Sequence, residues 1–144
     1  MRYPELKISY KRLPLIDSIT CSDDIYNFFM KHWDKGTLEM QEQVYVMCMD
    51  SNNGVICYKR IGIGNDRESI IDVKLAMACA IGCYCSKIVV AHNHPSGSLR
   101  PSQDDIEATY KLNKATLVMD IVLMDHLIIT TRGYYSFYND GLLV

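Results

Sequence analysis

The stretch KIVVAHNHPSGSLRPSQDD, residues 87–105, decides the fold that this sequence predicts. Its first six residues are mostly apolar and β-branched, which is typical of a short buried strand. One Pro, one Gly and two Ser between His94 and Arg100 predict a loop. Ser102 then resembles the cap of a helix that we expect to run to about residue 115. A strand, a loop and a helix in this order predict a sheet covered by at least one helix.

The segments outward from this stretch predict further strands and helices. Residues 43–50 (QVYVMCMD) are apolar on both faces, as in a strand buried on both sides. The following turn contains Asn53-Gly54, which supplies the positive φ that a hairpin needs. Expected helices cover residues 22–34, 69–83 and 102–115, and expected strands cover residues 5–12, 43–50, 55–61, 87–92, 119–124, 126–130 and 134–137. This order predicts an α/β or α+β fold with a mixed β-sheet sandwiched by helices.

Length, composition and charge narrow the class of protein. The chain has 144 residues, of which 49% are hydrophobic and 22% charged, as in one ordinary globular domain. We expect a single domain over residues 1–144, with residues 1–20 as an N-terminal extension and 21–144 as its folded body. The polar N-terminus does not resemble a signal peptide, and no apolar stretch reaches a membrane span, so we expect a cytoplasmic protein. The formal net charge of -2 does not favour a nucleic-acid partner.

The cysteines are expected to be buried thiols. The chain has six of them, mostly inside hydrophobic segments: Cys21, Cys48, Cys57, Cys79, Cys83 and Cys85. Thiols in a cytosolic protein usually pack as small apolar side chains. The pair in Cys83-Tyr84-Cys85 resembles a metal hook, but it has one intervening residue and no second such pair. We therefore assign it to the core.

Three side chains within residues 87–105 are candidate metal ligands. His92 and His94 are two residues apart at the end of a strand, so they point to the same face while Asn93 points away. Asp105 lies in the first turn of the next helix, which the loop can fold back over the strand end. Two His and one Asp with an open fourth position are typical of a catalytic zinc site. One Zn²⁺ with these ligands keeps a charge of about +1, which acidifies a bound water.

Such a water still needs a base, and two carboxylates precede the buried strand. Glu39 and Glu42 are the candidates, and Glu42 is preferred because it borders the strand more closely. Two structural interpretations stay open. Ser102 and Asp105 also form the pattern of a helix capping box, which is compatible with a metal bound to Asp105. His126, in an apolar context after Asp125, is interpreted as a hydrogen-bonded structural histidine.

Taken together, these residues resemble a known family. The pattern Glu42…His92-x-His94-x7-Ser102-x2-Asp105 is similar to the JAMM motif of the MPN (JAB) metalloenzymes. The segments AHNHPSG (91–97), PSQ-x-D (101–105), LMDHLII (123–129) and GYYSF (133–137) are similar to the RadC-like branch found in bacteria. The resemblance covers roughly residues 20–144. It implies the MPN/JAB fold, a cytidine-deaminase-like mixed sheet between helices.

The resemblance also implies an activity and a role for each site residue. His92, His94 and Asp105 would bind one zinc ion, Glu42 would act as the base, and Ser102 would stabilise the oxyanion. The implied function is a zinc-dependent hydrolase, a metalloprotease that cuts peptide or isopeptide bonds in a peptide or protein substrate.

The label of this family, DNA repair, supplies the alternative function. The chain would then be a repair-associated or a non-catalytic, partner-binding MPN module. Full-length RadC-like proteins carry a helix-hairpin-helix region ahead of this domain, and we expect the roughly 20 residues before Ser22 to be too few for it. DNA therefore stays an alternative partner that the net charge does not support.

Overall fold

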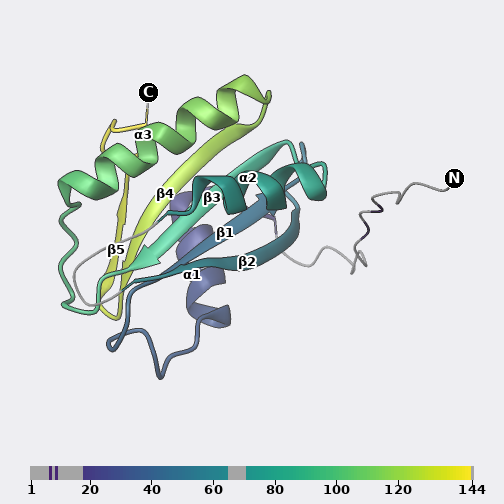
Figure 1. Ribbon diagram of the computed structural model, residues 1–144. Helices are drawn as coiled ribbons and strands as arrows, with labels where there is room; N and C mark the ends of the chain where they lie inside the picture. The colour runs from purple at the N-terminus through teal and green to yellow at the C-terminus, as the bar shows by residue number, and fades with distance from the viewer. Residues whose placement is uncertain (1–6, 8, 10–17, 65–70, 144) are drawn as a thin grey trace, which may run out of the picture.

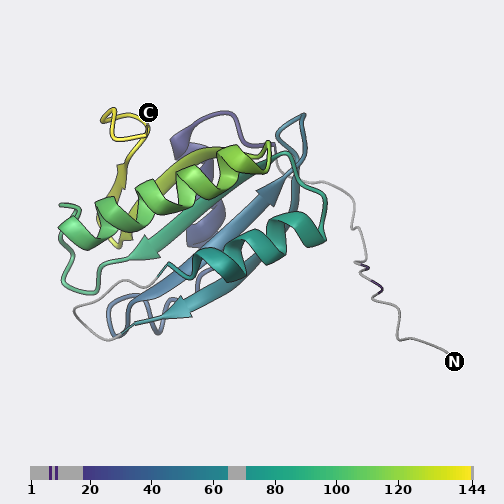
Figure 2. The ribbon, with the colours of Figure 1, turned by 45° about the horizontal axis from the view of Figure 1, so that its top comes forward.

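The protein folds as one mixed sheet between helices (Figure 1). The computed structural model describes residues 7, 9, 18–64 and 71–143. Within these residues the elements are, in order, α1 (Ser22–His32), β1 (Gln43–Met49), β2 (Val55–Ile63), α2 (Val73–Gly82), β3 (Lys87–Asn93), α3 (Gln103–Val118), β4 (Val122–Thr130) and β5 (Gly133–Ser136). The strand order in the sheet is β2-β1-β3-β4-β5. Helix α1 covers one face, and α2 and α3 cover the other (Figure 2), which confirms the expected sandwich.

The pairing of the central strand β3 brings three chain segments to one edge of the sheet. β3 is antiparallel to β1, with Val44 opposite His92, and parallel to β4. The carboxyl end of β3 therefore lies beside the amino end of β1. Because α3 crosses from β3 back to the parallel strand β4, its first turn also lies at this edge. Residues before β1, after β3 and at the start of α3 consequently meet.

The core is divided between the two faces by the strand period of two. Val44, Val46 and Cys48 of β1 pack under α2 and α3 with Ile88 and Val90 of β3. The intervening side chains face α1 instead, among them Met47, Met49, Val89 and Ala91. Burial on both faces explains why β1 and β3 are apolar almost throughout.

The β1–β2 hairpin forms at the predicted turn. Asp50 Oδ1 accepts hydrogen bonds from the backbone N–H groups of Asn52 and Gly54, both at 2.9 Å. Asn53 has a φ of 65°, the left-handed conformation that Asn adopts more readily than most residues.

Several predicted element boundaries are wrong or lie outside the described residues. The expected strands 119–124 and 126–130 are one strand, β4, which has a register shift opposite Ile88 and Val89. Met124 is the extra residue there, so the apparent break in the sequence pattern is a β-bulge. Helix α2 begins at Val73, capped by Asp72, and α3 extends to Val118. The expected strand 5–12 and the start of the expected helix 69–83 fall almost wholly outside the described residues.

The expectations drawn from composition have mixed outcomes. Cys48, Cys83 and Cys85 are buried, Cys57 and Cys79 are half-buried, and Cys21 is exposed. None of these six thiols forms a disulfide. Among the described helices, none combines the length and the apolar character needed to cross a membrane.

Candidate metal centre

Four polar side chains meet at the edge of the sheet where β3 ends. His92 belongs to β3, His94 follows it, Asp105 lies in the first turn of α3, and Glu42 immediately precedes β1. One ligand atom from each lies within 4.8 Å of all the others, so the four could hold a metal ion. His92 Nε2 is 2.9 Å from His94 Nε2, 3.3 Å from Asp105 Oδ1 and 3.7 Å from Glu42 Oε1.

The second nitrogen of each histidine has a partner that sets its tautomer. His94 Nδ1 lies 2.8 Å from the Ser98 carbonyl oxygen, which can only accept, so Nδ1 carries the hydrogen. His92 Nδ1 lies 2.7 Å from His126 Nε2, and His126 Nδ1 lies 2.6 Å from Thr109 Oγ1. Since Thr109 Oγ1 donates its hydrogen to the Asp105 carbonyl at 2.5 Å, it accepts from His126 Nδ1. His126 Nε2 therefore accepts from His92 Nδ1.

These partners leave both neutral histidines with Nε2 lone pairs aimed at the same point. Asp105 adds a carboxylate there: its Oδ2 accepts the Ser102 N–H at 2.8 Å, while its buried Oδ1 has no hydrogen-bond partner among the described residues. Acceptors that converge without a donor repel one another unless a cation lies between them. Tetrahedral zinc, with Zn–N bonds near 2.0–2.1 Å, separates its ligand atoms by about 3.3 Å. The separations of His92 Nε2 from His94 Nε2, 2.9 Å, and from Asp105 Oδ1, 3.3 Å, fit such an ion.

Burial and neighbouring charges favour neutral His92 and His126 and an ionised Asp105, which are the protonation states that metal binding needs. Burial lowers the pKa of His92, and burial together with the neighbouring His92 lowers that of His126 well below the usual value. Burial alone would raise the pKa of Asp105, but the imidazoles of His92 and His94 hold it well below its usual range. For His94, burial is outweighed by Asp105 and the Ser98 carbonyl, which raise its pKa. In the metal-free protein a proton therefore competes for His94.

The structure places each predicted site residue. His92, His94 and Asp105 converge as expected, with Asn93 on the opposite face. Glu42 is 4% exposed and joins them, whereas Glu39 is exposed and accepts a hydrogen bond from Thr131 instead. Ser102 is the exposed N-cap of α3 and forms a capping box with Asp105. The capping and metal interpretations of Asp105 are thus compatible, because the cap engages Oδ2, whereas Oδ1 lies 3.3 Å from His92 Nε2 and is not used by the cap.

Asn93 has a role that the sequence pattern did not predict. Its side chain is fully buried on the face away from the histidines. Its Oδ1 accepts the Gln43 N–H at 2.7 Å, and its Nδ2 donates to the carbonyls of Leu38 and Gln41 at 2.7 and 2.9 Å. These bonds fix the backbone on both sides of Glu42. The sequence feature that could have indicated this role is a polar residue between the two candidate histidine ligands, in a strand whose other residues are buried on both faces.

The pair His126 and Thr109 was also only partly foreseen. His126 is fully buried, hydrogen-bonded and stacked on Phe137 with ring centroids 4.4 Å apart, in agreement with a structural histidine. Its contact with His92 links it to the metal centre, and Thr109 on α3 orients it. No local pattern predicts this contact, because it joins residues 17 and 34 positions apart.

The loop between the histidines and α3 is shaped by Gly97. This residue has a φ of 78°, and the backbone N–H of Gly97 donates to the His94 carbonyl at 2.9 Å. A Cβ atom at Gly97 would lie 2.7 Å from Arg132 Nη2, so glycine also makes room for that side chain. The resulting turn places the Ser98 carbonyl where it orients His94.

Comparison with known proteins identifies relatives for nearly the whole chain. The family model described as "RadC-like JAB domain" matches residues 19–142. A UPF0758 protein of Acinetobacter baumannii is 32% identical over 142 residues, which is 99% of this chain and 57% of that protein. UPF0758 proteins of Porphyromonas gingivalis and Thermotoga maritima are 39% and 36% identical over 72% of this chain and 46% of their own length. The chain thus spans about half the length of these relatives.

Proposed function

Because the chain belongs to the family of RadC-like JAB domains, we propose that it is a zinc-dependent hydrolase of peptide or isopeptide bonds. His92, His94 and Asp105 are its proposed metal ligands, and Glu42 is its proposed base. The names of the relatives state no activity, so the proposal depends on the chemistry of the site itself.

One observation carries this proposal. The Nε2 atoms of His92 and His94 lie 2.9 Å apart, and the Asp105 carboxylate lies 3.3 Å from the first through Oδ1 and 3.4 Å from the second through Oδ2. The other nitrogen of each imidazole is already engaged by His126 or Ser98, and Oδ2 also accepts the Ser102 N–H. These hydrogen bonds orient the ligand atoms toward one point before a cation binds. Three protein ligands leave a fourth position for solvent, which distinguishes catalytic from structural zinc sites.

Of the four side chains at this centre, that of His94 is the most exposed. The His94 side chain is 14% exposed, whereas those of His92, Asp105 and Glu42 are at most 5% exposed. A substrate carbonyl therefore approaches past His94 and the exposed Ser102. The low exposure of Glu42 excludes bulk water, which strengthens electrostatic interactions at this position.

The bound zinc ion would supply Lewis acidity, polarising the substrate carbonyl and lowering the pKa of water toward ~7. Glu42 accepts a proton from the attacking water and returns it to the leaving amine. Ser102 Oγ accepts the Asp105 N–H at 3.1 Å, which leaves its hydroxyl hydrogen free to donate to the oxyanion. Asn93 holds the Glu42 backbone in place throughout.

The test replaces Glu42 and, as a matched control, the exposed Glu39 three residues earlier. Glu42→Gln should lower the hydrolysis rate by about 10²- to 10⁴-fold, since it removes a proton acceptor but preserves shape. Bound zinc, measured by elemental analysis, should be nearly unchanged. Glu39→Gln should leave both quantities unaltered. The substrates to assay are a pool of fluorogenic peptides and a lysine ε-linked isopeptide.

Two outcomes would contradict the proposal in different ways. Undiminished cleavage by the Glu42→Gln variant would remove Glu42 from the mechanism. Wild-type protein that binds zinc through these ligands but cleaves neither class of probe would favour the alternative, a partner-binding module. A salt-titrated DNA-binding measurement would then test the repair-associated alternative.

A further inference from the structure

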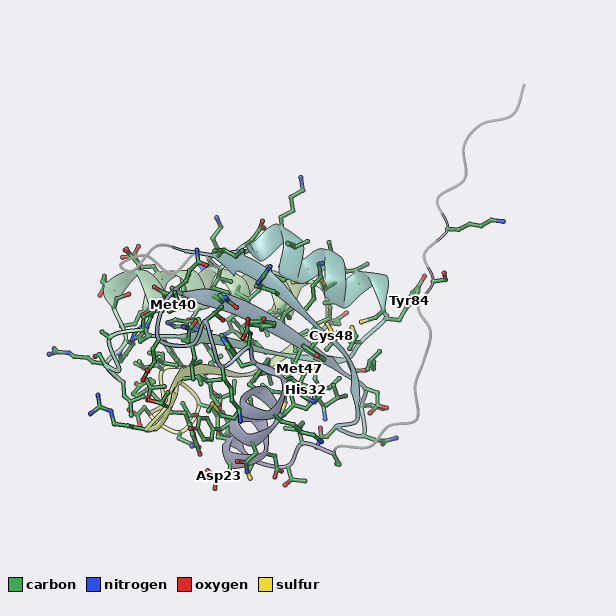
Figure 3. All side chains as sticks on the ribbon, turned by 90° about the horizontal axis from the view of Figure 1, so that it is seen from below. Asp23, His32, Met40, Met47, Cys48 and Tyr84 are labelled. Carbon is green, nitrogen blue, oxygen red and sulfur yellow. The ribbon has the colours of Figure 1, made fainter. Side chains whose placement is uncertain are left out.

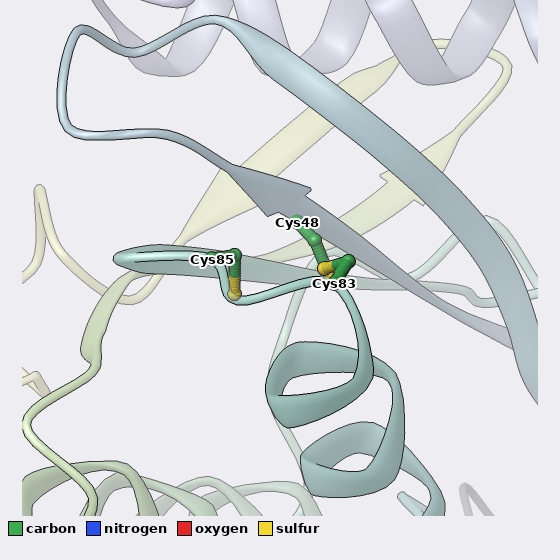
Figure 4. A group of neighbouring side chains, drawn as sticks. All are labelled: Cys48, Cys83 and Cys85. Carbon is green, nitrogen blue, oxygen red and sulfur yellow. The ribbon is translucent and has the colours of Figure 1, made fainter. Parts of the chain in front are cut away.

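A second group of side chains that could bind a metal lies at the opposite end of strands β1 and β3. Cys48 is in β1, Cys83 caps the end of α2, and Cys85 precedes β3 (Figure 4). Their sulfur atoms lie within 4.8 Å of one another, and the three residues are 0%, 6% and 7% exposed. They therefore converge from strand β1 and from the short segment between α2 and β3 into a buried position.

A fourth thiol adjoins this group. Cys57 of β2 lies directly opposite Cys48 in the hairpin register. Its side chain is half-buried and packs against the core cluster that contains Cys48, Cys83 and Cys85. A fourth thiol beside three converging ones resembles the four-sulfur environment of a structural zinc site.

The backbone between Cys83 and Cys85 has a conformation that brings both sulfurs inward. The Cys85 N–H donates to the Ala80 carbonyl and the Tyr84 N–H to the Ile81 carbonyl, at 3.1 and 3.2 Å, which is the Schellman arrangement of a helix end. Tyr84 occupies its left-handed position with a φ of 53°, where glycine is usual. Its side chain is 89% exposed. As at the end of α3, where Asp120 has a φ of 54°, this conformation belongs to the helix end itself. Its effect is to direct Cys83 and Cys85 to the same side, toward Cys48.

We propose that Cys48, Cys83 and Cys85 bind a thiophilic metal ion such as zinc, with Cys57 adjacent to the fourth position. Ordinary burial of thiols as small apolar side chains does not require this convergence. Tetrahedral zinc with Zn–S bonds near 2.3 Å places its sulfurs about 3.8 Å apart. Sulfurs already within 4.8 Å need to move by about 1 Å or less to reach that separation.

The chemistry of this position makes the ion structural. The surrounding side chains are apolar, among them Val46, Ala80 and Ile88, and provide no base for an attacking water. A bound ion would connect the end of α2 to β1 and to the start of β3. The site is independent of the proposed hydrolase centre, since Glu42 and Cys48 are six residues apart along one strand, about 20 Å.

Cobalt substitution of the full chain separates the two sites without any activity measurement. Cobalt bound by thiolates gives an intense sulfur-to-metal charge-transfer absorption in the near ultraviolet. Nitrogen and oxygen ligands do not give this absorption. Reduced wild-type protein should bind about two zinc ions, and its cobalt form should show this absorption. Cys85→Ser should lower the zinc content to about one and abolish most of the absorption. Cys21→Ser, at an exposed thiol outside the group, should change neither.

A second pair of variants separates loss of the cysteine site from misfolding and from loss of the histidine centre. Cys48→Val fills the buried space with an apolar side chain of similar size, so it should fold and still lose the thiolate absorption. His94→Ala should retain this absorption while losing the other ion, so a failure of the hydrolase centre is distinguishable from a failure here. Reduced wild-type protein without thiolate absorption, or with absorption that survives both cysteine substitutions, overturns the proposal.

Discussion

The two ends of strands β1 and β3 carry groups of ligand atoms that differ in chemistry and in support. At one end, Glu42, His92, His94 and Asp105 offer nitrogen and oxygen. At the other, Cys48, Cys83 and Cys85 offer sulfur. Figure 3 shows the two ends through the labelled residues Met40, close in sequence to Glu42, and Tyr84, which lies beyond Cys48.

The difference lies in what surrounds the ligands. Each histidine and Asp105 is held by a further hydrogen bond, to His126, Ser98 or Ser102, and a buried carboxylate stands beside them. Such outer partners orient ligands and tune the ion, as a reactive centre requires. The cysteines are surrounded by apolar side chains, and the Cys83 thiol donates to the Ala80 carbonyl at 3.6 Å. If both proposals hold, one sheet supports a reactive centre and a structural one on the same face.

The strongest test of this contrast is Asp105→Asn. The change removes the charge, while an amide oxygen can still accept the Ser102 N–H and keep the helix cap. The amide NH₂ then donates to the Nε2 lone pairs in place of an ion. We expect hydrolysis to fall by at least about 10³-fold and one zinc equivalent to be lost. Elemental analysis and the peptide assay measure these changes.

Asp104→Asn is the matched control, because Asp104 is the exposed neighbour in the same first turn of α3. It should leave zinc content and rate within about twofold, since a surface charge near a helix start contributes about 0.3–1 kcal/mol to stability only. Equal effects of the two substitutions would show that the general charge of the turn matters, rather than coordination by Asp105.

Asn93→Ala is expected to have the next largest effect. The substitution leaves the Gln43 N–H and the carbonyls of Leu38 and Gln41 without a side-chain partner. Each such loss typically costs about 1–3 kcal/mol, so with three groups affected the free energy of unfolding should fall by about 3 kcal/mol or more. The rate should also fall because Glu42 is no longer held, although the three metal ligands remain. Urea unfolding and zinc analysis separate the two effects.

Asn93→Asp sharpens this prediction. The carboxylate still accepts the Gln43 N–H, but it presents an acceptor to two carbonyl oxygens that need a donor. It should destabilise the protein more than Asn93→Ala, despite matching asparagine in shape. A smaller loss for the aspartate variant would mean that Asn93 acts through packing and not through its hydrogen bonds.

Thr109→Val tests the hydrogen bonds that orient His92, and its expected effect is smaller. Valine preserves the shape of Thr109 but cannot accept the hydrogen of His126 Nδ1, so the tautomer that orients His92 loses its preference. Loss of such an outer partner usually lowers metal affinity by about 10- to 100-fold. Zinc affinity at the histidine centre should fall by about 10-fold, the smaller end of this range. The thiolate absorption of the cobalt form should not change.

Thr116→Val provides the control on the same helix. Thr116 is also buried and its hydroxyl also donates to a backbone carbonyl, that of Asn113, but it does not contact a histidine. It should lower stability by about as much as Thr109→Val and leave zinc affinity unchanged. A similar loss of affinity in both variants would point to the helix as a whole.

The contrast between the two ends also explains what the sequence could predict. His92, His94 and Asp105 are close in the chain, so strand alternation and a helix start sufficed to bring them together. Glu42 was preferred on its position before β1, and the antiparallel pairing of β1 and β3 places it beside His92. The sheet and its covering helices followed from the periodicity of long, strongly apolar segments.

The rest depended on contacts that no local pattern encodes. The two expected strands around Asp125 are one, because a bulge at Met124 lets β4 continue through a polar residue. Asp125 tolerates burial by accepting hydrogen bonds from Ser22, Ser136 and Tyr138. The cysteines were assigned to the core, and they are largely buried, but their convergence needs α2 to end beside the β1–β2 hairpin. Only tertiary structure sets that distance.

Tyr84→Gly is the smallest effect and the sharpest test of the cysteine end. A non-glycine residue in the left-handed conformation costs about 1 kcal/mol, and the exposed Tyr84 side chain has no packing to lose. Glycine removes this cost but increases the entropy of the unfolded chain, so we expect a net gain in stability of about 0.5 kcal/mol without metal. Since glycine keeps the turn, thiolate absorption should persist and zinc at the histidine centre should not change. Urea unfolding of the metal-free protein measures the gain. A clear loss of stability would mean that the tyrosine ring makes a contact that matters, and a loss of thiolate absorption would mean that the turn at Tyr84 does position Cys83 and Cys85.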